Sequence, residues 1–312
     1  MIGINDNKLH AIGLALIAVA MASAQDAIVK SVSGIYPVYE TVFFRTAVSL
    51  PILLGWLIFR GGLGKLATPH LKQVILRGVV LSSAYFAYIL ALATMPMANS
   101  VSIYFTMPFF VAALSGWVLK ERVPIHRWIA IAVGFAGVWV MVRPDSASFQ
   151  PAALLALYSA FAYAIGQMMG RSLSQKVDTL VIANWQNVIY LCVAVTLGLC
   201  VFGFNLSNDS SKVLAFLTRP PAWPNFIDAT AMTAMGIFST FAMMAYVNAY
   251  RLAPANFVAP FEYSAMVWAV LYGVVLFHDF PDRWTWIGAA IVVGAGLFML
   301  WRDHAVVRQT TG

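Results

Sequence analysis

The sequence predicts an all-α integral membrane protein with ten transmembrane helices, arranged as two inverted five-helix repeats around a central cavity. Of the 312 residues, 61% are hydrophobic and 10% are charged, whereas a soluble domain carries roughly 25% charged residues. Several apolar stretches approach the length of about 20 residues that a membrane-spanning helix requires. The sequence lacks the alternation of barrel strands, and helices satisfy their own backbone hydrogen bonds in lipid, so we expect the spans to be helical.

Ten helices follow when the apolar stretches are divided at polar residues, prolines and glycines. The longest connection, residues 203–224, is predicted to be a surface loop. A cleaved signal peptide is the alternative for the first segment, because Lys8 precedes an apolar run and Ala22-Ser23-Ala24 resembles a cleavage site. The repeat described below needs this segment as its first helix, which favours a helix that is retained. The predicted helices are 9–31, 36–59, 71–94, 97–119, 125–143, 149–173, 178–202, 225–251, 254–278 and 283–301.

The basic residues predict how the chain crosses the membrane. With the N-terminus inside, thirteen lysines and arginines fall on the inner side and five on the outer side, which is the bias of cytoplasmic loops. We therefore expect a multi-pass protein of a bacterial-type inner membrane with both termini in the cytoplasm. The basic residues that give the net charge of +7 lie in these loops, so we expect no nucleic-acid partner. The expected partners are the bilayer and a small-molecule substrate, and the protein is expected to be a monomer. Cys192 and Cys200 share one apolar span and are expected to be packed thiols, with no metal site and no cofactor.

Weak internal similarity divides the chain into a first repeat, residues 1–145, and a second repeat, residues 146–312, with a short cytoplasmic tail. Residues 96–140 align without gaps on residues 254–298, and a second offset aligns the first helix with the sixth. Because each repeat has an odd number of helices, the second must enter the membrane in the opposite orientation. Inverted repeats are typical of transporters, which bind substrate between the repeats near the middle of the membrane. The aligned pairs include Pro96 with Pro254, Glu121 with Asp279, Trp128 with Trp286, Asp26 with Gln167 and Arg45 with Gln186.

Short motifs in both repeats carry a family resemblance. They include Asp26-Ala27-Ile28-Val29-Lys30, Phe43-Phe44-Arg45, Pro96-Met97-Ala98-Asn99-Ser100, Leu119-Lys120-Glu121-Arg122, Ala253-Pro254-Ala255-Asn256, Glu262-Tyr263 and Trp286-Ile287-Gly288. In their order and spacing, over almost the whole chain, they resemble the EamA-type family of the drug/metabolite transporter superfamily, and in particular its exporters of amino acids, including aromatic ones. The resemblance implies ten helices in an inverted five-plus-five repeat, cytoplasmic termini, a central cavity and alternating access. Asp279 departs from the glutamate that is common in the family after the ninth helix.

The expected function is transport of small metabolites by alternating access, with amino-acid export as the leading interpretation. The alternative transporter is an importer of a vitamin- or nucleoside-like metabolite, of the riboflavin or S-adenosylmethionine type. A membrane channel is the alternative outside the transporters, although no repeated ring of charges or filter-like loop is evident. An enzyme is not expected, because the sequence has no H-E-x-x-H, G-x-S-x-G or P-loop motif.

Three charged residues inside predicted spans are the main site candidates. An arginine deep in a span, such as Arg45, costs roughly 2.5–3.5 kcal/mol on insertion scales and needs a partner. It could hold a substrate carboxylate, or it could form a structural ion pair with Asp26 or Glu40, and both interpretations stay open. Asp26, one turn before Lys30, is a candidate for contact with substrate or a proton. Glu262 is the other proton-coupling candidate, and a neutral acid that only supports packing is its alternative.

Aromatic and amide side chains complete the predicted site, because small-molecule sites combine apolar faces with a few polar groups. Packing without substrate contact is the alternative for each of them. Pro108 and Pro260 lie inside predicted spans, where a missing N–H kinks a helix, and they are the hinge candidates. The predicted substrate-binding residues are Arg45, Asp26, Tyr85, Tyr88, Asn99, Tyr104, Tyr163, Gln167, Trp185, Tyr246 and Glu262.

Overall fold

The computed structural model describes residues 4–118, 123–143, 150–204, 211–253 and 255–311, and in these ranges the chain is helical without strands. Ten segments of the described chain are long and apolar enough to cross a membrane. The predicted all-α class and the ten predicted spans are therefore confirmed. The inverted relation between the two halves stays a prediction. The predicted pairings of Glu121 and Pro254 lie outside the described residues.

Single helices form eight of the spans, and their bounds agree with the predicted ones to within three residues, except at the N-terminal end of the first helix and the C-terminal end of the last. These helices are α1 (Ile4–Val32), α2 (Val38–Phe59), α3 (Leu71–Thr94), α6 (Ile125–Val142), α7 (Ala152–Leu173), α8 (Thr179–Gly203), α10 (Phe226–Leu252) and α13 (Arg283–Thr311).

The fourth and ninth spans are each divided into two helices, where the sequence predicted one. The fourth consists of α4 (Met97–Tyr104) and α5 (Met107–Val118), and the ninth of α11 (Ala255–Glu262) and α12 (Ser264–Phe277). Pro108 is the second residue of α5, where its missing N–H costs nothing, while its ring is incompatible with a helical carbonyl four residues earlier, at the end of α4. Pro260 lies in the last turn of α11.

Two short helices lie in the connections. The 3-10 helix η1 (Leu63–Leu66) follows α2, and α9 (Lys212–Thr218) lies in the segment that was predicted to be a surface loop. The hydroxyl of Ser211 caps α9 by accepting a hydrogen bond from the backbone N–H of Leu214 at 3.2 Å, and Phe216 is 2% exposed. A serine directly before an apolar run is the usual start of a helix, and the sequence interpretation missed it here.

The chain forms two compact units, each assembled from separate stretches of sequence. Unit 1 consists of Met1–Ser23, Met95–Ala160 and Phe241–Gly312, and unit 2 of Ala24–Thr94 and Phe161–Thr240. Helices α1, α7 and α10 are each divided between the two units, with one end in unit 1 and the other end in unit 2. Both units therefore contain residues from both predicted repeats, and the existence of these repeats stays a prediction.

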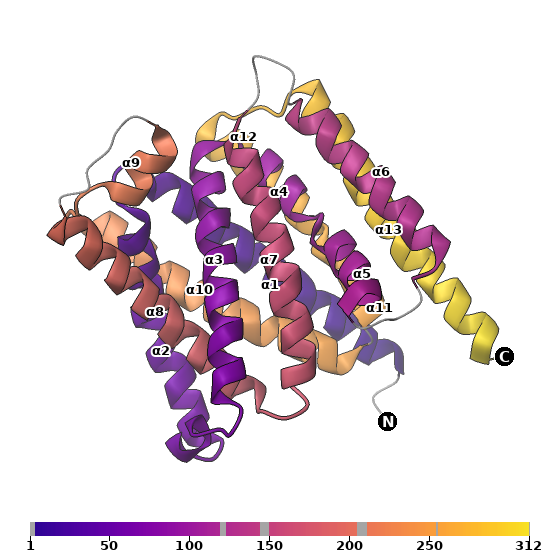
Figure 1. Cartoon of the computed structure of the whole chain (residues 1–312), viewed down its shortest axis with the longest axis horizontal. Coiled ribbons are helices and arrows are strands. Elements are labelled where there is room, and N and C mark those ends of the chain that lie inside the picture. Colours follow the sequence, from indigo (N-terminus) through magenta and orange to yellow (C-terminus); the bar gives the residue numbers. More distant parts are fainter. Residues whose placement is uncertain (1–3, 119–122, 144–149, 205–210, 254, 312) are drawn as a thin grey trace. The chain divides into compact units, whose positions relative to one another are not determined.

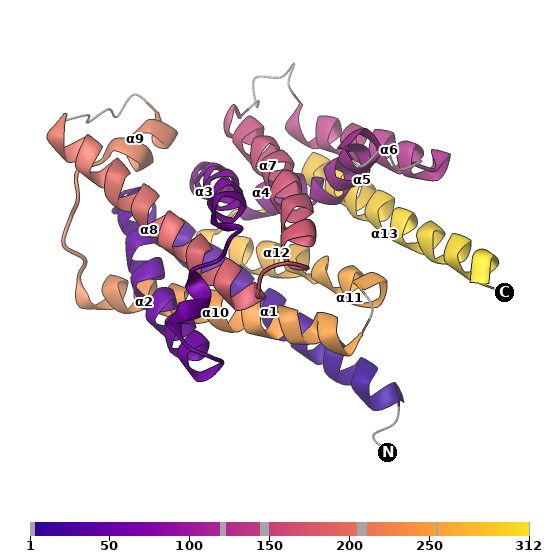
Figure 2. The ribbon, with the colours of Figure 1, turned by 60° about the horizontal axis from the view of Figure 1, so that its bottom comes forward.

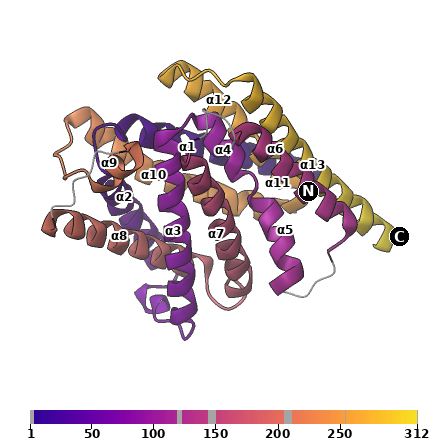
Figure 3. The same ribbon diagram turned by 45° about the horizontal axis from the view of Figure 1, so that its top comes forward.

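Unit 1 is organised around the pair formed by α6 and α13, which run side by side (Figures 1 and 3). Glycines allow this close approach, because a Cβ added to Gly288 would lie 2.6 Å from the carbonyl oxygen of Gly137. The two broken spans also meet in this unit, where α4 packs against α12. The ring of Phe105, at the first break, stacks on that of Tyr263, at the second, with centroids 4.8 Å apart.

Unit 2 is organised around α2 and α8, with α3 packed on α8 (Figure 2). Buried polar side chains connect α2 to α8. The hydroxyl of Ser49 donates to Oδ1 of Asn187 at 2.7 Å, and Nδ2 of Asn184 donates to the carbonyl of Leu53 at 3.3 Å. Hydrogen bonds between helices are a usual means of association in lipid, and these bonds fix the helices that carry the polar cluster described next.

Candidate functional site

Arg45 lies on α2, inside a membrane span, and contacts side chains of three other helices of unit 2. Its Nε donates a hydrogen bond to Oε1 of Gln25 on α1 at 3.2 Å. Its guanidinium carbon lies 4.7 Å from the ring centroid of Tyr85 on α3 and 5.4 Å from that of Tyr190 on α8. Cation–π contacts are worth about 2 kcal/mol when they are desolvated, which offsets part of the cost of placing an arginine in the span.

Gln25 orients this arginine relative to the aromatic rings. Its side chain is buried, its carbonyl oxygen accepts from Arg45, and its Nε2 donates to the hydroxyl of Tyr85 at 3.5 Å. The rings of Tyr85 and Tyr190 pack at a centroid distance of 5.1 Å and an angle of 31°. We call this group the polar cluster of unit 2; its members are Gln25, Asp26, Arg45, Tyr85, Tyr88 and Tyr190.

One nitrogen of Arg45 remains without a partner. Its Nη1 is buried and makes no hydrogen bond to any residue that the structure describes, and an unsatisfied charged donor costs more than the roughly 1–3 kcal/mol of a neutral one. Neither predicted counter-ion satisfies it. Asp26 accepts from the hydroxyl of Tyr88 at 2.7 Å, and Glu40 accepts from the backbone N–H of Ala222 at 3.2 Å. The structure thus shows no ion pair of Arg45 with either acid, and the arginine can receive an external anion.

Asp26 still lies within electrostatic range of Arg45. The polar cluster therefore presents one guanidinium and one carboxyl group beside a pair of aromatic rings. A zwitterion with an apolar body matches all three features, because its carboxylate, its ammonium group and its side chain each find a partner.

Arg77 adds a second cation two turns before Tyr85 on α3. Its Nε donates to the carbonyl of Gly166 at 3.0 Å, and its Nη1 donates to Oε1 of Gln186 at 3.4 Å. Gln186 is one helical turn from Tyr190 on α8, and Tyr163 of α7 lies within electrostatic range of both Arg77 and Tyr190. The cluster thus continues toward α7.

The predicted substrate-binding residues fall into three groups. Arg45, Asp26, Tyr85 and Tyr88 meet in the polar cluster, and Tyr163 lies at its edge. Gln167 is exposed on α7, and the indole of Trp185 donates to the carbonyl of Leu66 at 3.1 Å, against an apolar cluster near η1. The remaining ones belong to unit 1: Asn99 and Tyr104 on α4, Tyr246 on α10 and Glu262 on α11.

Sequence reasoning did not select three residues of this region. Gln25 is adjacent to Asp26, but its partner depends on how α1 packs. Arg77 lies within the predicted helix 71–94 and was counted only as one of the thirteen inner-side basic residues. Tyr190 could have been found, because it lies four residues after Gln186 and such residues share a helix face.

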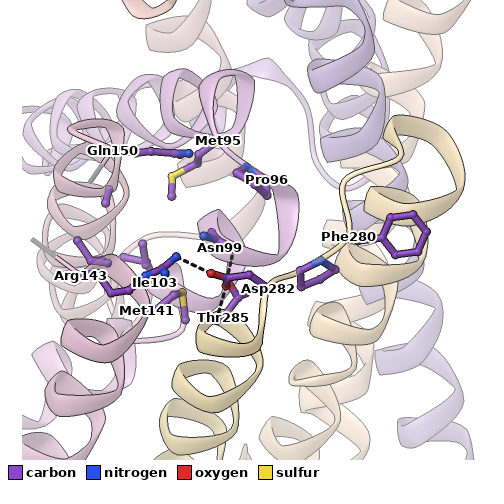
Figure 4. A pocket seen from close by; sticks show the side chains of 13 residues that line it. Met95, Pro96, Asn99, Ile103, Met141, Arg143, Gln150, Phe280, Asp282 and Thr285 are labelled. Atoms are coloured by element: carbon purple, nitrogen blue, oxygen red, sulfur yellow. Dashed lines mark hydrogen bonds and ion pairs between the residues drawn. The ribbon is translucent and has the colours of Figure 1, made fainter. Parts of the chain in front are cut away.

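Unit 1 holds a cavity of about 170 Å³ between the ends of α4, α6 and α13 (Figure 4). The guanidinium of Arg143 forms an ion pair with Asp282. The hydroxyl of Thr285 lies 3.0 Å from Oδ1 of Asn99 and 2.6 Å from Oδ1 of Asp282. Since these polar groups bind one another, as the dashed lines in Figure 4 show, they act as a clamp that holds the three helix ends together.

The clamp makes stability depend on pH. Burial raises the pKa of Asp282, but hydrogen bonds from Thr285 and the nearby Arg143 guanidinium together lower it by more than burial raises it. The pKa therefore lies below its ordinary value of 3.8. A lowered native pKa stabilises the fold above the ordinary value, and the contribution is lost as the pH falls through the native value. We expect Asp282→Asn to lower the unfolding temperature at pH 7, measured by tryptophan fluorescence in detergent, and the difference from the native protein to shrink in acid.

Arg143→Gln is the matched variant for this test. Each substitution removes the same ion pair. The loss of stability in the double variant should therefore be close to the larger of the two single losses and well below their sum. A difference between Asp282→Asn and the native protein that stays the same down to acidic pH would contradict the clamp.

Comparisons with known proteins bear on what this arrangement serves. The S-adenosylmethionine uptake transporter of Rickettsia prowazekii is 23% identical, covering 92% of this chain and 91% of its own. The riboflavin transporter of Vibrio cholerae is 28% identical, covering 82% and 80%. The pseudopaline exporter CntI of Pseudomonas aeruginosa is 26% identical, covering 90% and 93%.

A solved structure, titled "Crystal structure of protein", matches with a TM-score of 0.61 and 20% identity over 95% of this chain and 97% of the other, which supports the fold alone. The EamA-like transporter family matches residues 9–143 and 150–301. This chain therefore belongs to the EamA-like transporter family and is a membrane transporter of small metabolites, not an enzyme.

Proposed function

We propose that this transporter carries a small zwitterion with an α-amino acid group, and that export of amino acids is its activity. The buried, unpaired Nη1 of Arg45 carries this proposal. A substrate carboxylate would accept hydrogen bonds from Arg45, and a substrate ammonium group would lie toward Asp26. The rings of Tyr85 and Tyr190 would border the apolar part of the substrate.

We propose alternating access between two inverted repeats as the mechanism. The family matches two separate ranges, and each range lies entirely within one predicted repeat, which supports this organisation. Transporters with inverted repeats use discontinuous helices at their sites, and the breaks near Pro108 and Pro260 support these residues as hinges. The charge bias favours an inner-membrane location with both termini in the cytoplasm, and we propose that the monomer is the transporting unit.

The relatives' names favour a second candidate, the uptake of vitamin- or nucleoside-like metabolites. S-adenosylmethionine contains an α-amino acid group and would use the same contacts with Arg45 and Asp26. Riboflavin has neither charged group and would leave both without a partner. The relatives include both an uptake protein and an exporter, so direction needs its own measurement.

The test is counterflow in liposomes that contain the purified protein. We expect saturable exchange of labelled phenylalanine or S-adenosylmethionine, competed by free amino acids but not by phenylalaninamide, which lacks the carboxylate. Riboflavin exchange that amino acids do not inhibit would contradict the proposal and favour the second candidate. Flux that rises linearly with concentration, without counterflow, would indicate a channel. For direction, cells that make the protein should lose preloaded label faster than cells that make Arg45→Ala.

A further inference from the structure

The break in the ninth span places a carboxyl group inside the membrane-spanning part of unit 1. Glu262 is the last residue of α11, two residues after Pro260, and Tyr263 separates it from α12. All three lie within the span Phe257–Phe277. Carboxyl groups at such a depth are rare and are commonly found on ion or proton pathways.

Glu262 has a neutral partner. The hydroxyl of Tyr250 on α10 donates to its Oε1, and the ring of Tyr250 stacks on that of Tyr246 with centroids 6.5 Å apart. No basic side chain in the described part of the chain forms an ion pair with Glu262. Because an unpaired charge is costly in lipid, this carboxyl group can bind a proton reversibly, according to whether water reaches it.

Packing holds the break in place. The ring of Tyr263 stacks on that of Phe105, and a Cβ added to Gly296 of α13 would lie 1.8 Å from the hydroxyl of Tyr263, so a larger residue there would displace this ring. Next to it, the hydroxyl oxygen of Ser264 is buried and has no partner among the described residues. A polar group without a partner at the start of a half-helix is unusual in a packed span, and it adds a second polar atom to the break.

Asp26, the other candidate for proton coupling, lies in a different environment. It belongs to unit 2 and has the positive charge of Arg45 within electrostatic range. Glu262 has no such cation, so the two acids have different chemistry.

We propose that Glu262 is the proton carrier of this transporter, so that substrate movement is coupled to a proton gradient. The inference rests on the proposed transport function. The Glu262 carboxylate takes a proton from hydronium on one side of the membrane, forming an O–H bond and leaving water. It returns the proton to water on the other side, and no other bond changes. Within unit 1, the described titratable groups on the surrounding elements are His10 on α1, Tyr104 on α4, Tyr246, Tyr250 and Arg251 on α10, Tyr263, Tyr272, His278 and Asp279 on or beside α12, and Asp282, Arg283 and Arg302 beside or on α13.

Two measurements on the same liposomes separate coupling from transport. Counterflow at equal pH reports substrate exchange, and accumulation under an imposed pH gradient reports coupling. Glu262→Gln keeps the size of the side chain and an oxygen that accepts from Tyr250, but it cannot carry a proton. We expect counterflow to stay within about threefold of the native protein, and gradient-driven accumulation to fall by about tenfold or more, to the level seen with a proton ionophore.

Glu40→Gln is the matched control, because Glu40 is a glutamate near the start of α2 that accepts from a backbone N–H. It should leave both measurements unchanged. Glu262→Asp, which keeps an acid, should retain part of the gradient-driven accumulation.

Gradient-driven accumulation by Glu262→Gln at the native level would overturn the carrier role. A native protein that shows counterflow but no accumulation under an imposed pH gradient would overturn it as well. Loss of both activities in folded Glu262→Gln would assign Glu262 to substrate binding and also overturn it. Failure of counterflow in the native protein, for every substrate, would instead overturn the proposed function. If Glu262→Gln does not fold, Tyr250→Phe removes the partner of the carboxyl group. It should shift the pH dependence of accumulation, and an unchanged profile would overturn the proposal.

Discussion

Replacement of Arg45 by alanine should lower kcat/KM for transport by about 10- to 100-fold while folded protein is still obtained. The substitution removes the donor that we assign to the substrate carboxylate, and hydrogen bonds to charged groups are worth about 1.5–3 kcal/mol. The rings of Tyr85 and Tyr190 keep each other as packing partners, which limits the damage to the fold. Initial rates of counterflow over a range of substrate concentrations give the ratio directly.

Two further arginine variants make this test specific. Arg45→Lys keeps the positive charge but loses the planar fork that binds a carboxylate with two hydrogen bonds, so it should be intermediate. Arg60→Ala is the control, because Arg60 lies just after α2 with its guanidinium 5.3 Å from the ring of Trp56, outside the polar cluster. An Arg45→Ala variant with native kcat/KM would remove Arg45 from the site. If Arg45→Ala lowered the residual flux of phenylalaninamide by the same factor as the flux of the amino acid, Arg45 would support the fold and would not bind the substrate carboxylate.

Gly288→Ala should lower the unfolding temperature by several degrees, the second large effect that we expect. The added Cβ would lie 2.6 Å from the carbonyl oxygen of Gly137 and 2.9 Å from the Cβ of Met141. Backbone atoms cannot rotate away, so α6 and α13 must separate. Overpacking of this kind typically costs about 1–3 kcal/mol, and thermal unfolding followed by size-exclusion chromatography in detergent measures it.

Gly294→Ala on the same helix is the matched control, because a Cβ added there meets no atom within 4 Å. Alanine favours a helix over glycine by up to about 1 kcal/mol, so this variant should be as stable as the native protein or slightly more. Similar unfolding temperatures for the two variants would show that α6 and α13 do not approach each other as closely as in the structure.

The sequence was sufficient for the spans, because hydropathy and length alone define helices in lipid. It was less informative about the breaks. Pro108 and Pro260 marked their positions, but whether a proline bends or ends a helix depends on tertiary packing such as the stacking of Phe105 on Tyr263. For the site, Arg45 and Asp26 were recognisable as charges within apolar segments. Gln25 was missed, because helical periodicity does not tell which neighbouring helix a given face will meet.

The same limit explains why the predicted site residues were spread over both units. Asn99 and Glu262 have the polarity that a substrate site needs, and nothing in their local sequence distinguishes them from Tyr85 or Tyr88. The difference arises from which helices pack together, and that information lies in contacts between residues far apart in the chain.

Each unit is assembled from stretches that lie far apart in the sequence, and this has a consequence for biosynthesis. Ser49 is synthesised long before its partner Asn187, and Arg45 long before Tyr190. The early helices therefore enter the bilayer with polar groups whose partners have not yet been synthesised. Contacts of such high sequence separation form late and slowly. A chain that stops after Arg143 should therefore remain a target for membrane proteases, and co-production of the missing half should rescue it.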